Sequence, residues 1–309
     1  MSAPELATSV GRVVLPNPIL TASGTSGHGA ELDAYFPLRE LGAVTVKSLS
    51  ADAWPGNAAP RVHSARDGML NSVGLQGAGV LAWLRDDLPE LQRAGARVVA
   101  SIWGRTVEGF AEAARALRGS AEDIVAVEVN LSCPNLDGGR HLFAQSGPDT
   151  HAAIAAVVAE LDRPVWAKLT AQVTSLAEIA AAAVEGGADA VTLVNTMLGM
   201  AIEVDARRYR LGSGAAGGGL SGRAIHPIAV RAVHDVHAAL PELPIVGVGG
   251  VATGDDAIEL LLAGASAVQV GTATFGDPRA PRRVLHDVRR WCIRHDVGSI
   301  DELIGAVHG

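Results

Sequence analysis

The sequence predicts a single α/β domain, residues 1–309, that folds as a (β/α)8 barrel. Two observations lead to this prediction. Eight short runs rich in Val and Ile occur along the chain, with Ala- and Leu-rich helical segments between several of them. The 309 residues also contain no change of composition that would mark a linker between domains. Eight strands with intervening helices fit a barrel of about 250 residues, whereas a doubly wound sheet usually ends sooner or adds a second domain.

Each element can be placed in order. The segment "LATSVGRVVLPNP", which alternates around Gly11, predicts a short β-hairpin across the bottom of the barrel. "SLAE" at 175–178 resembles a capping box that begins a helix, and Gly264 is placed to end the helix of "DDAIELLLAG". Gly138, Gly139 and Gly147 lie in "NLDGGRHLFAQSG", which predicts a lid loop at the C-terminal face. The expected strands are 19–23, 43–47, 97–102, 124–130, 165–169, 190–195, 245–249 and 267–271.

Charge and composition exclude several classes of protein. The formal net charge is −8, and nucleic-acid surfaces need clustered Lys and Arg, so we expect no nucleic-acid partner. No run approaches the ~20 apolar residues of a membrane span, and the N-terminus does not resemble a signal peptide, so we expect a cytoplasmic protein. The two cysteines, Cys133 and Cys292, form no CxxC motif, so we predict neither a structural metal site nor an iron–sulfur cluster in this chain.

A barrel requires its chemistry to lie at the C-terminal ends of the strands. Ser and Gly are common wherever a strand ends, so they are weak signals alone, and the Lys and Asn residues are more informative. The residues at these ends are Ser23, Gly24, Lys47, Ser48, Ser101, Asn130, Lys168, Asn195, Thr196, Gly249, Gly250, Gly271 and Thr272.

The two lysines point to function. Lys47 and Lys168 are the only lysines, and Arg supplies the other 23 of 25 basic residues. Both fall at expected strand ends on the same rim, where a compact ammonium differs chemically from a planar guanidinium. We therefore predict functional roles for both.

Glycine-rich turns follow the seventh and eighth expected strands, at Gly249, Gly250 and Gly271. Bare backbone N–H groups can approach an anion closely, and in such barrels these two loops commonly bind phosphate. The phosphate could belong to a sugar phosphate or to a flavin mononucleotide, and the glycines do not decide between them. "GGGLSG", which ends at Gly222, supplies another such loop.

The motifs "NPILTASG", "GMLNSVGLQG", "VNLSCPN", "NTMLGMAIE" and "GVGGVATGDDAIELLLAGASAVQVGTATF" resemble, in order and spacing, those of the dihydroorotate dehydrogenases. The resemblance extends from about residue 5 to 290. Cysteine in "NLSCPN" is similar to the soluble class 1 enzymes, and "NTMLGMAIE" resembles the B-type catalytic subunit.

The resemblance implies FMN as the cofactor and dihydroorotate as the substrate. It also implies two catalytic residues, Cys133, which would be the base, and Lys47. FMN would be bound by Ser23, Gly24, Lys47, Ser48, Ser101, Asn130, Lys168, Gly222, Gly249, Gly250, Gly271 and Thr272. Dihydroorotate or orotate would be bound by Lys47, Asn71, Gly74, Leu75, Asn130, Asn195 and Thr196.

Residue chemistry agrees with these roles. Asn can donate and accept, and Lys neutralises a carboxylate, so both suit a small anion edged with polar groups. Two-electron oxidation of a carbon–carbon bond requires a hydride acceptor that side chains cannot supply. The alternative reading of Cys133 is a buried structural cysteine, the commoner fate of cysteines.

Several alternatives share part of the pattern. B-type enzymes pass electrons to NAD through FAD and an iron–sulfur cluster, both of which are bound by a partner subunit. This chain lacks the sequence motifs that would bind FAD or the cluster. A homodimer that uses fumarate, as A-type enzymes do, is the other route. A reductase of uracil-like rings, a flavin-free phosphosugar enzyme and a non-catalytic flavin-binding protein also remain as alternatives.

Overall fold

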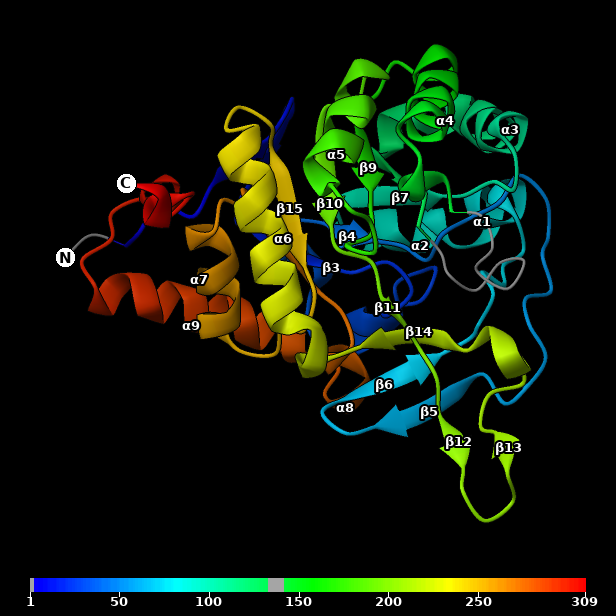
Figure 1. Ribbon diagram of the computed structural model, residues 1–309. Coiled ribbons are helices and arrows are strands. Elements are labelled where there is room, and N and C mark those ends of the chain that lie inside the picture. The colour runs from blue at the N-terminus through cyan, green and yellow to red at the C-terminus, as the bar shows by residue number, and fades with distance from the viewer. Residues whose placement is uncertain (1–2, 133–141) are drawn as a thin grey trace.

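A closed barrel of eight parallel strands forms the centre of the computed structural model, which describes residues 3–132 and 142–309 (Figure 1). The strands lie in the order β3-β16-β15-β10-β9-β8-β7-β4, and a parallel bridge between Leu20 and Ala43 joins the two ends of this series. The barrel prediction is therefore confirmed. Its strands are β3 (Ile19–Thr21), β4 (Val44–Thr45), β7 (Val98–Ile102), β8 (Ala126–Asn130), β9 (Val165–Lys168), β10 (Ala190–Leu193), β15 (Ile245–Val248) and β16 (Ala267–Val270).

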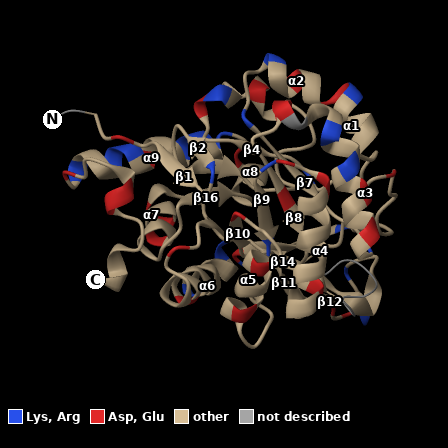
Figure 2. Cartoon of the chain, turned by 90° about the horizontal axis from the view of Figure 1, so that it is seen from above, with Lys and Arg blue, Asp and Glu red and all other residues tan. Residues whose placement is uncertain are grey.

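Helices surround the barrel, and acidic and basic residues are interspersed along them (Figure 2). The helix signals are confirmed at two points. The Ser175 hydroxyl accepts a hydrogen bond from the Glu178 amide at the start of α5, and Gly264 follows the end of α7 with φ +119°. The helices are α1 (Val80–Asp86), α2 (Leu88–Arg93), α3 (Val107–Leu117), α4 (Gly147–Glu160), α5 (Leu176–Glu185), α6 (His226–Ala239), α7 (Gly254–Leu262), α8 (Ala273–Gly276) and α9 (Ala280–Arg294).

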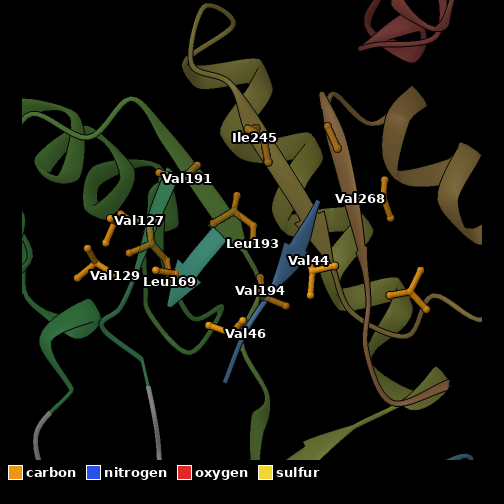
Figure 3. Packing of buried hydrophobic residues seen from close by; sticks show 14 of the residues in the cluster. Val44, Val46, Val127, Val129, Leu169, Val191, Leu193, Val194, Ile245 and Val268 are labelled. Atoms are coloured by element: carbon orange, nitrogen blue, oxygen red, sulfur yellow. The ribbon is translucent and has the colours of Figure 1, made fainter. Parts of the chain in front are cut away.

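The main apolar core lies between the strands and these helices (Figure 3). Val127 and Ile245 from the strands belong to one buried cluster with Phe110 from α3 and Val233 from α6. Strands that are covered on both sides are expected to be apolar over their whole length. This explains why they appear in the sequence as continuous Val- and Ile-rich runs.

A hairpin of β1 (Thr8–Val10) and β2 (Val13–Leu15) packs against the N-terminal ends of the barrel strands. Val10 and Leu15 are fully buried in a second cluster with Ala126 and Trp166, which lie at the start of β8 and β9. The predicted hairpin is thus confirmed, and it closes the barrel bottom with apolar side chains.

A four-stranded antiparallel sheet lies at the other end of the barrel, and the sequence did not predict it. We call it the mouth sheet, and its strand order is β11-β14-β6-β5. A two-stranded ribbon extends beside it (Figure 1). The strands are β5 (Val62–Ala65), β6 (Gly68–Asn71), β11 (Met197–Gly199) and β14 (Gly218–Ser221), with β12 (Ile202–Glu203) and β13 (Arg208–Tyr209) in the ribbon.

Most of the predicted lid, including Gly138 and Gly139, lies outside the described residues. Gly147, which we expected to be a flexible point, is instead the first residue of α4, where the Ser146 hydroxyl caps the helix. Its position at the start of a capped helix argues against a hinge there.

The two ends of the described chain meet at the side of the barrel. Glu5 forms a parallel bridge with Ser299, and its amide donates to the Gly298 carbonyl oxygen at 2.8 Å. Among the described residues, no helix combines the length and apolar character needed to cross a bilayer.

Candidate active site

A cavity opens at the C-terminal ends of the barrel strands, beneath the mouth sheet. Most residues predicted for the site line this cavity. They are Ser23, Gly24, Lys47, Ser48, Asn71, Gly74, Leu75, Asn130, Lys168, Asn195, Thr196, Gly222, Gly249, Gly250, Gly271 and Thr272.

Ser101 lies behind the cavity wall. Its side chain is fully buried, and its hydroxyl is 2.9 Å from the Ser48 hydroxyl. Ser48 is in turn 3.1 Å from the Ser23 hydroxyl. Ser101 is the fourth residue of β7 and so lies one step below the strand end. Ser101 therefore does not line the cavity itself but forms a hydrogen bond with Ser48, which does.

The asparagine side chains of the cavity are held in a connected set of hydrogen bonds. The Asn195 amide nitrogen donates to the Asn130 carbonyl oxygen at 3.2 Å, and the Asn130 amide nitrogen donates to Ser48 at 3.0 Å. The Asn195 side-chain oxygen accepts from the Thr196 amide at 2.8 Å. From the mouth sheet, the Asn71 amide nitrogen donates to the Gly219 carbonyl oxygen at 3.3 Å. Fixed amides of this kind can recognise a polar ring edge with little loss of entropy on binding.

Lys47 brings a positive charge to one side of the cavity. Its backbone amide donates to Gly27 at 3.0 Å, and a Cβ atom added at Gly24 would be 3.6 Å from the Lys47 ammonium nitrogen. Burial and then the charge of Lys47 lower the pKa of His28 below its ordinary value, against the opposing effects of Asp87 and Glu31. The Lys47 ammonium therefore lowers the pKa of a neighbouring imidazole, in a region that is partly shielded from solvent.

Lys168 forms an ion pair that sequence reasoning missed. Its ammonium nitrogen is 3.6 Å from a carboxylate oxygen of Glu128, and the two side chains are 6% and 0% exposed. Glu128 points into the barrel between Val127 and Val129 of β8. A carboxylate inside an apolar strand is the sequence signal that would have revealed it, because buried charges are rare unless they are paired.

The turn after β15 has a backbone that only glycine adopts readily. Gly249 and Gly250 have φ of +140° and +73°. A Cβ atom at Gly250 would be 2.6 Å from the Cβ atom of His226, whose ring Nδ1 is 2.8 Å from the Gly249 carbonyl oxygen. This turn presents bare backbone to the cavity, and the hydroxyls of Thr272 and Ser221 lie nearby, 2.8 Å apart.

Cys133 lies outside the described residues, so its side chain is not placed. The last described residue before it, Ser132, is buried, and its hydroxyl donates to the Lys168 carbonyl oxygen at 3.0 Å. Ser132 also accepts from the Asn195 side chain at 3.0 Å. The chain therefore leaves β8 beside the cavity immediately before Cys133.

Sequence reasoning also missed the apolar part of the cavity lining, which includes Val62, Met69, Ile225 and Phe275. Two of these residues belong to β5 and β6, which form a local hairpin that joins the mouth sheet through the long-range pairing of β6 with β14. No local pattern places them there.

Comparison with known proteins identifies related sequences. A sequence profile of the family described as dihydroorotate dehydrogenase matches residues 5–291. The catalytic subunit of dihydroorotate dehydrogenase B (NAD(+)) from Alkaliphilus oremlandii is 42% identical over 305 residues, which cover 99% of each chain. A putative dihydroorotate dehydrogenase A (fumarate) from Solibacter usitatus is 41% identical, over 98% of this chain and 99% of the relative. The crystal structure of DHODH from Eimeria tenella in complex with ferulenol has a similar fold, with a TM-score of 0.81, 22% identity and coverage of 99% of this chain and 89% of that one.

Proposed function

The chain belongs to the dihydroorotate dehydrogenase family, and we propose that it oxidises dihydroorotate to orotate in the de novo synthesis of pyrimidines, with FMN as the hydride acceptor. The observation that carries this proposal is that the side chains predicted to bind cofactor and substrate line one cavity. Two lysines and three asparagines, Lys47, Lys168, Asn71, Asn130 and Asn195, line it together with the glycine turns after β15 and β16.

The chemistry of the cavity lining fits FMN. Dihydroorotate dehydrogenases are flavin-dependent enzymes. At one end, the turn of Gly249 and Gly250 packs against Ala229 and His226 too closely for a Cβ atom, and its bare backbone lines the cavity. A phosphate would be held there with Gly222, Gly271 and Thr272. Hydroxyls and amides of Ser23, Ser48 and Asn130 would face the ring and ribityl chain. When bound, FMN would accept the hydride that no side chain can accept.

Gly250→Ala is expected to reduce the FMN content of the purified protein to a small fraction of the wild-type value. The substitution forces alanine into a left-handed conformation, which costs about 1–2 kcal/mol, and places a methyl group against His226. FMN content is measured from the absorbance of flavin released by denaturation. The control is Gly276→Ala in α8, where a Cβ atom would meet no atom within 4 Å. Equal FMN content in both variants would contradict the proposed phosphate site.

Other residues of the chain would bind the substrate and remove its proton. Lys47 would neutralise the substrate carboxylate, while Asn71, Asn130, Asn195 and Thr196, with backbone at Gly74 and Leu75, would bind the carbonyl and imide groups. Cys133 would remove the proton from carbon 5 as the hydride leaves carbon 6. The fixed asparagine set supports this proposal because it would hold the ring in one orientation without rearrangement.

We propose that the electrons then leave through a separate partner subunit that carries FAD and an iron–sulfur cluster and reduces NAD. The name of the Alkaliphilus relative, a catalytic subunit of an NAD(+) enzyme, supports this route. The name of the Solibacter relative, at nearly the same identity, supports fumarate as the second candidate acceptor. We also propose that the catalytic chain forms a homodimer and works in the cytoplasm as one FMN-binding barrel domain.

One titration tests substrate and cofactor together. We expect the purified protein to be yellow and to lose its flavin absorbance when dihydroorotate is added without oxygen. The isolated chain is then assayed with fumarate and with NAD. Direct reduction of NAD by the isolated chain would contradict the partner subunit, and colourless protein that gains no activity with added FMN would favour a flavin-free phosphosugar enzyme.

A further inference from the structure

A buried carboxylate lies beneath the cavity floor. Glu128 is 0% exposed, and one of its oxygens, Oε2, accepts from the Gln269 amide nitrogen at 2.7 Å and from the Thr192 hydroxyl at 3.1 Å. These donors come from β16 and β10, two barrel strands with β15 between them. The carboxylate is therefore fixed by rigid strands.

The other oxygen of Glu128 lies beside the Lys168 ammonium. Within the described part of the chain, no donor comes within hydrogen-bonding distance of this oxygen, Oε1, and the Lys168 ammonium is 3.6 Å away. Lys168 also lines the cavity. Lys168 thus lies between the fixed Glu128 carboxylate inside the barrel and the ligand cavity.

Stability alone does not account for this arrangement. Burial of a charge pair costs desolvation free energy, and replacing such a pair by well-packed apolar side chains is often neutral or stabilising. The layer directly below is apolar, with Ala126 and Trp166 in the bottom cluster, so the barrel interior accommodates apolar residues next to this level. Lys168 alone separates the Glu128 carboxylate from the ligand cavity, so an effect on the bound ligand explains the buried charge better than stability does.

Resting on the proposed binding of FMN beside Lys168, we propose that Glu128 is a positioning residue that balances the charge of Lys168 and so lowers the reduction potential of the bound flavin. A reduced flavin carries negative charge, which an ammonium stabilises and a carboxylate opposes. Glu128 would offset part of the stabilisation given by Lys168. The reduced flavin would then still pass its electrons on readily, which turnover requires.

The test is the midpoint potential of FMN in the Glu128→Gln holoprotein, measured at fixed pH against a reference dye. One charge acting across on the order of 10 Å of protein changes an equilibrium roughly tenfold. We therefore expect the potential to rise by the equivalent of about tenfold, or about 30 mV for a two-electron couple. The control is Glu128→Asp, which keeps the charge and should stay near the wild-type potential. An unchanged or lower potential in Glu128→Gln, or an equal rise in Glu128→Asp, would overturn the proposal.

Gln269→Leu gives a second measurement if Glu128→Gln fails to fold or to bind FMN. It withdraws a hydrogen bond from the carboxylate while keeping the charge of Glu128. The same Gln269 nitrogen also donates to the neutral Thr45 hydroxyl at 3.3 Å, and the Gln269 side-chain oxygen has no hydrogen-bond partner among the described residues. We expect the potential to fall, because the negative charge of Glu128 becomes less well compensated. An unchanged or raised potential would refute the role of Glu128.

These measurements are independent of the substrate. If the wild-type protein binds FMN but dihydroorotate does not reduce it, the proposed function fails while the potentials still test Glu128. If dihydroorotate reduces the wild-type flavin and no variant shifts the potential, the inference about Glu128 fails alone.

Discussion

Cys133→Ser is expected to slow the reduction of bound FMN by dihydroorotate by about 10²-fold or more, which is the usual effect of losing a general base. A serine hydroxyl has a far higher pKa than a thiol, so it removes the carbon-bound proton poorly. The measurement is single-turnover flavin bleaching in a stopped-flow instrument without oxygen. This isolates proton and hydride removal from the later transfer of electrons to an acceptor.

The matched control is Cys292→Ser in α9. Burial raises the pKa of the Cys292 thiol above its ordinary value, and the side chain is fully buried in the main core. We expect this variant to reduce its flavin at the wild-type rate even if it is less stable. Near-normal flavin reduction in Cys133→Ser would refute the assignment of the base.

The same assignment predicts a pH profile. An ordinary thiol has a pKa of about 8.5, so only a few per cent is ionised at neutral pH. Flavin reduction in the wild-type protein should therefore rise with pH as Cys133 ionises, and this rise should be absent in Cys133→Ser. A flat profile from about pH 6 to 9 in the wild-type protein would count against the thiol as base.

Lys47→Met is expected to lower kcat/KM for dihydroorotate by about 10²-fold, because hydrogen bonds to charged groups contribute about 1.5–3 kcal/mol each. The loss should appear mainly in KM, since the carboxylate is bound in the ground state and the transition state alike. An enzyme that reduces uracil-like rings would not depend on Lys47 in this way, because such rings have no carboxylate.

Two further measurements sharpen this test. Lys47→Arg keeps the charge but replaces a compact ammonium by a planar group, so we expect partial activity. In Lys47→Met, the pKa of His28 should rise, because the Lys47 charge contributes to lowering it. That pKa can be followed by NMR of the imidazole protons. A raised His28 pKa with unchanged KM would show that the charge was removed and that the substrate does not use it.

The barrel could be predicted because its elements carry local signals. Most positions of each strand are apolar, and parallel strands covered on both faces favour that pattern. The Ser175 cap and the glycine after α7 are likewise local. Because every strand ends on the same rim, the order of the strands alone was enough to bring Lys47 and Lys168, 121 residues apart in the sequence, to one cavity.

The rest depends on contacts between distant segments. Asn71 on β6 pairs with Gly219 on β14, and a two-to-four-residue strand has too little sequence to signal that partner. Glu128 could be read as a strand residue, but its ion pair with Lys168 depends on the register of β8 and β9, and its contact with Gln269 on β16 reaches across the barrel. Ser101 was expected at the rim and lies one step below it, a shift smaller than the precision with which a sequence defines a strand end.

The pairing of Glu5 with Ser299 brings an early and a late segment of the described chain together beside the barrel. The starting point of the polypeptide is then separable from the architecture. A circular permutant with the old ends linked and new ends opened in the exposed turn between β12 and β13 would retain every strand neighbour of the barrel. Such a permutant would carry its new chain ends on the ribbon beside the mouth sheet, at a distance from the bridge between Glu5 and Ser299.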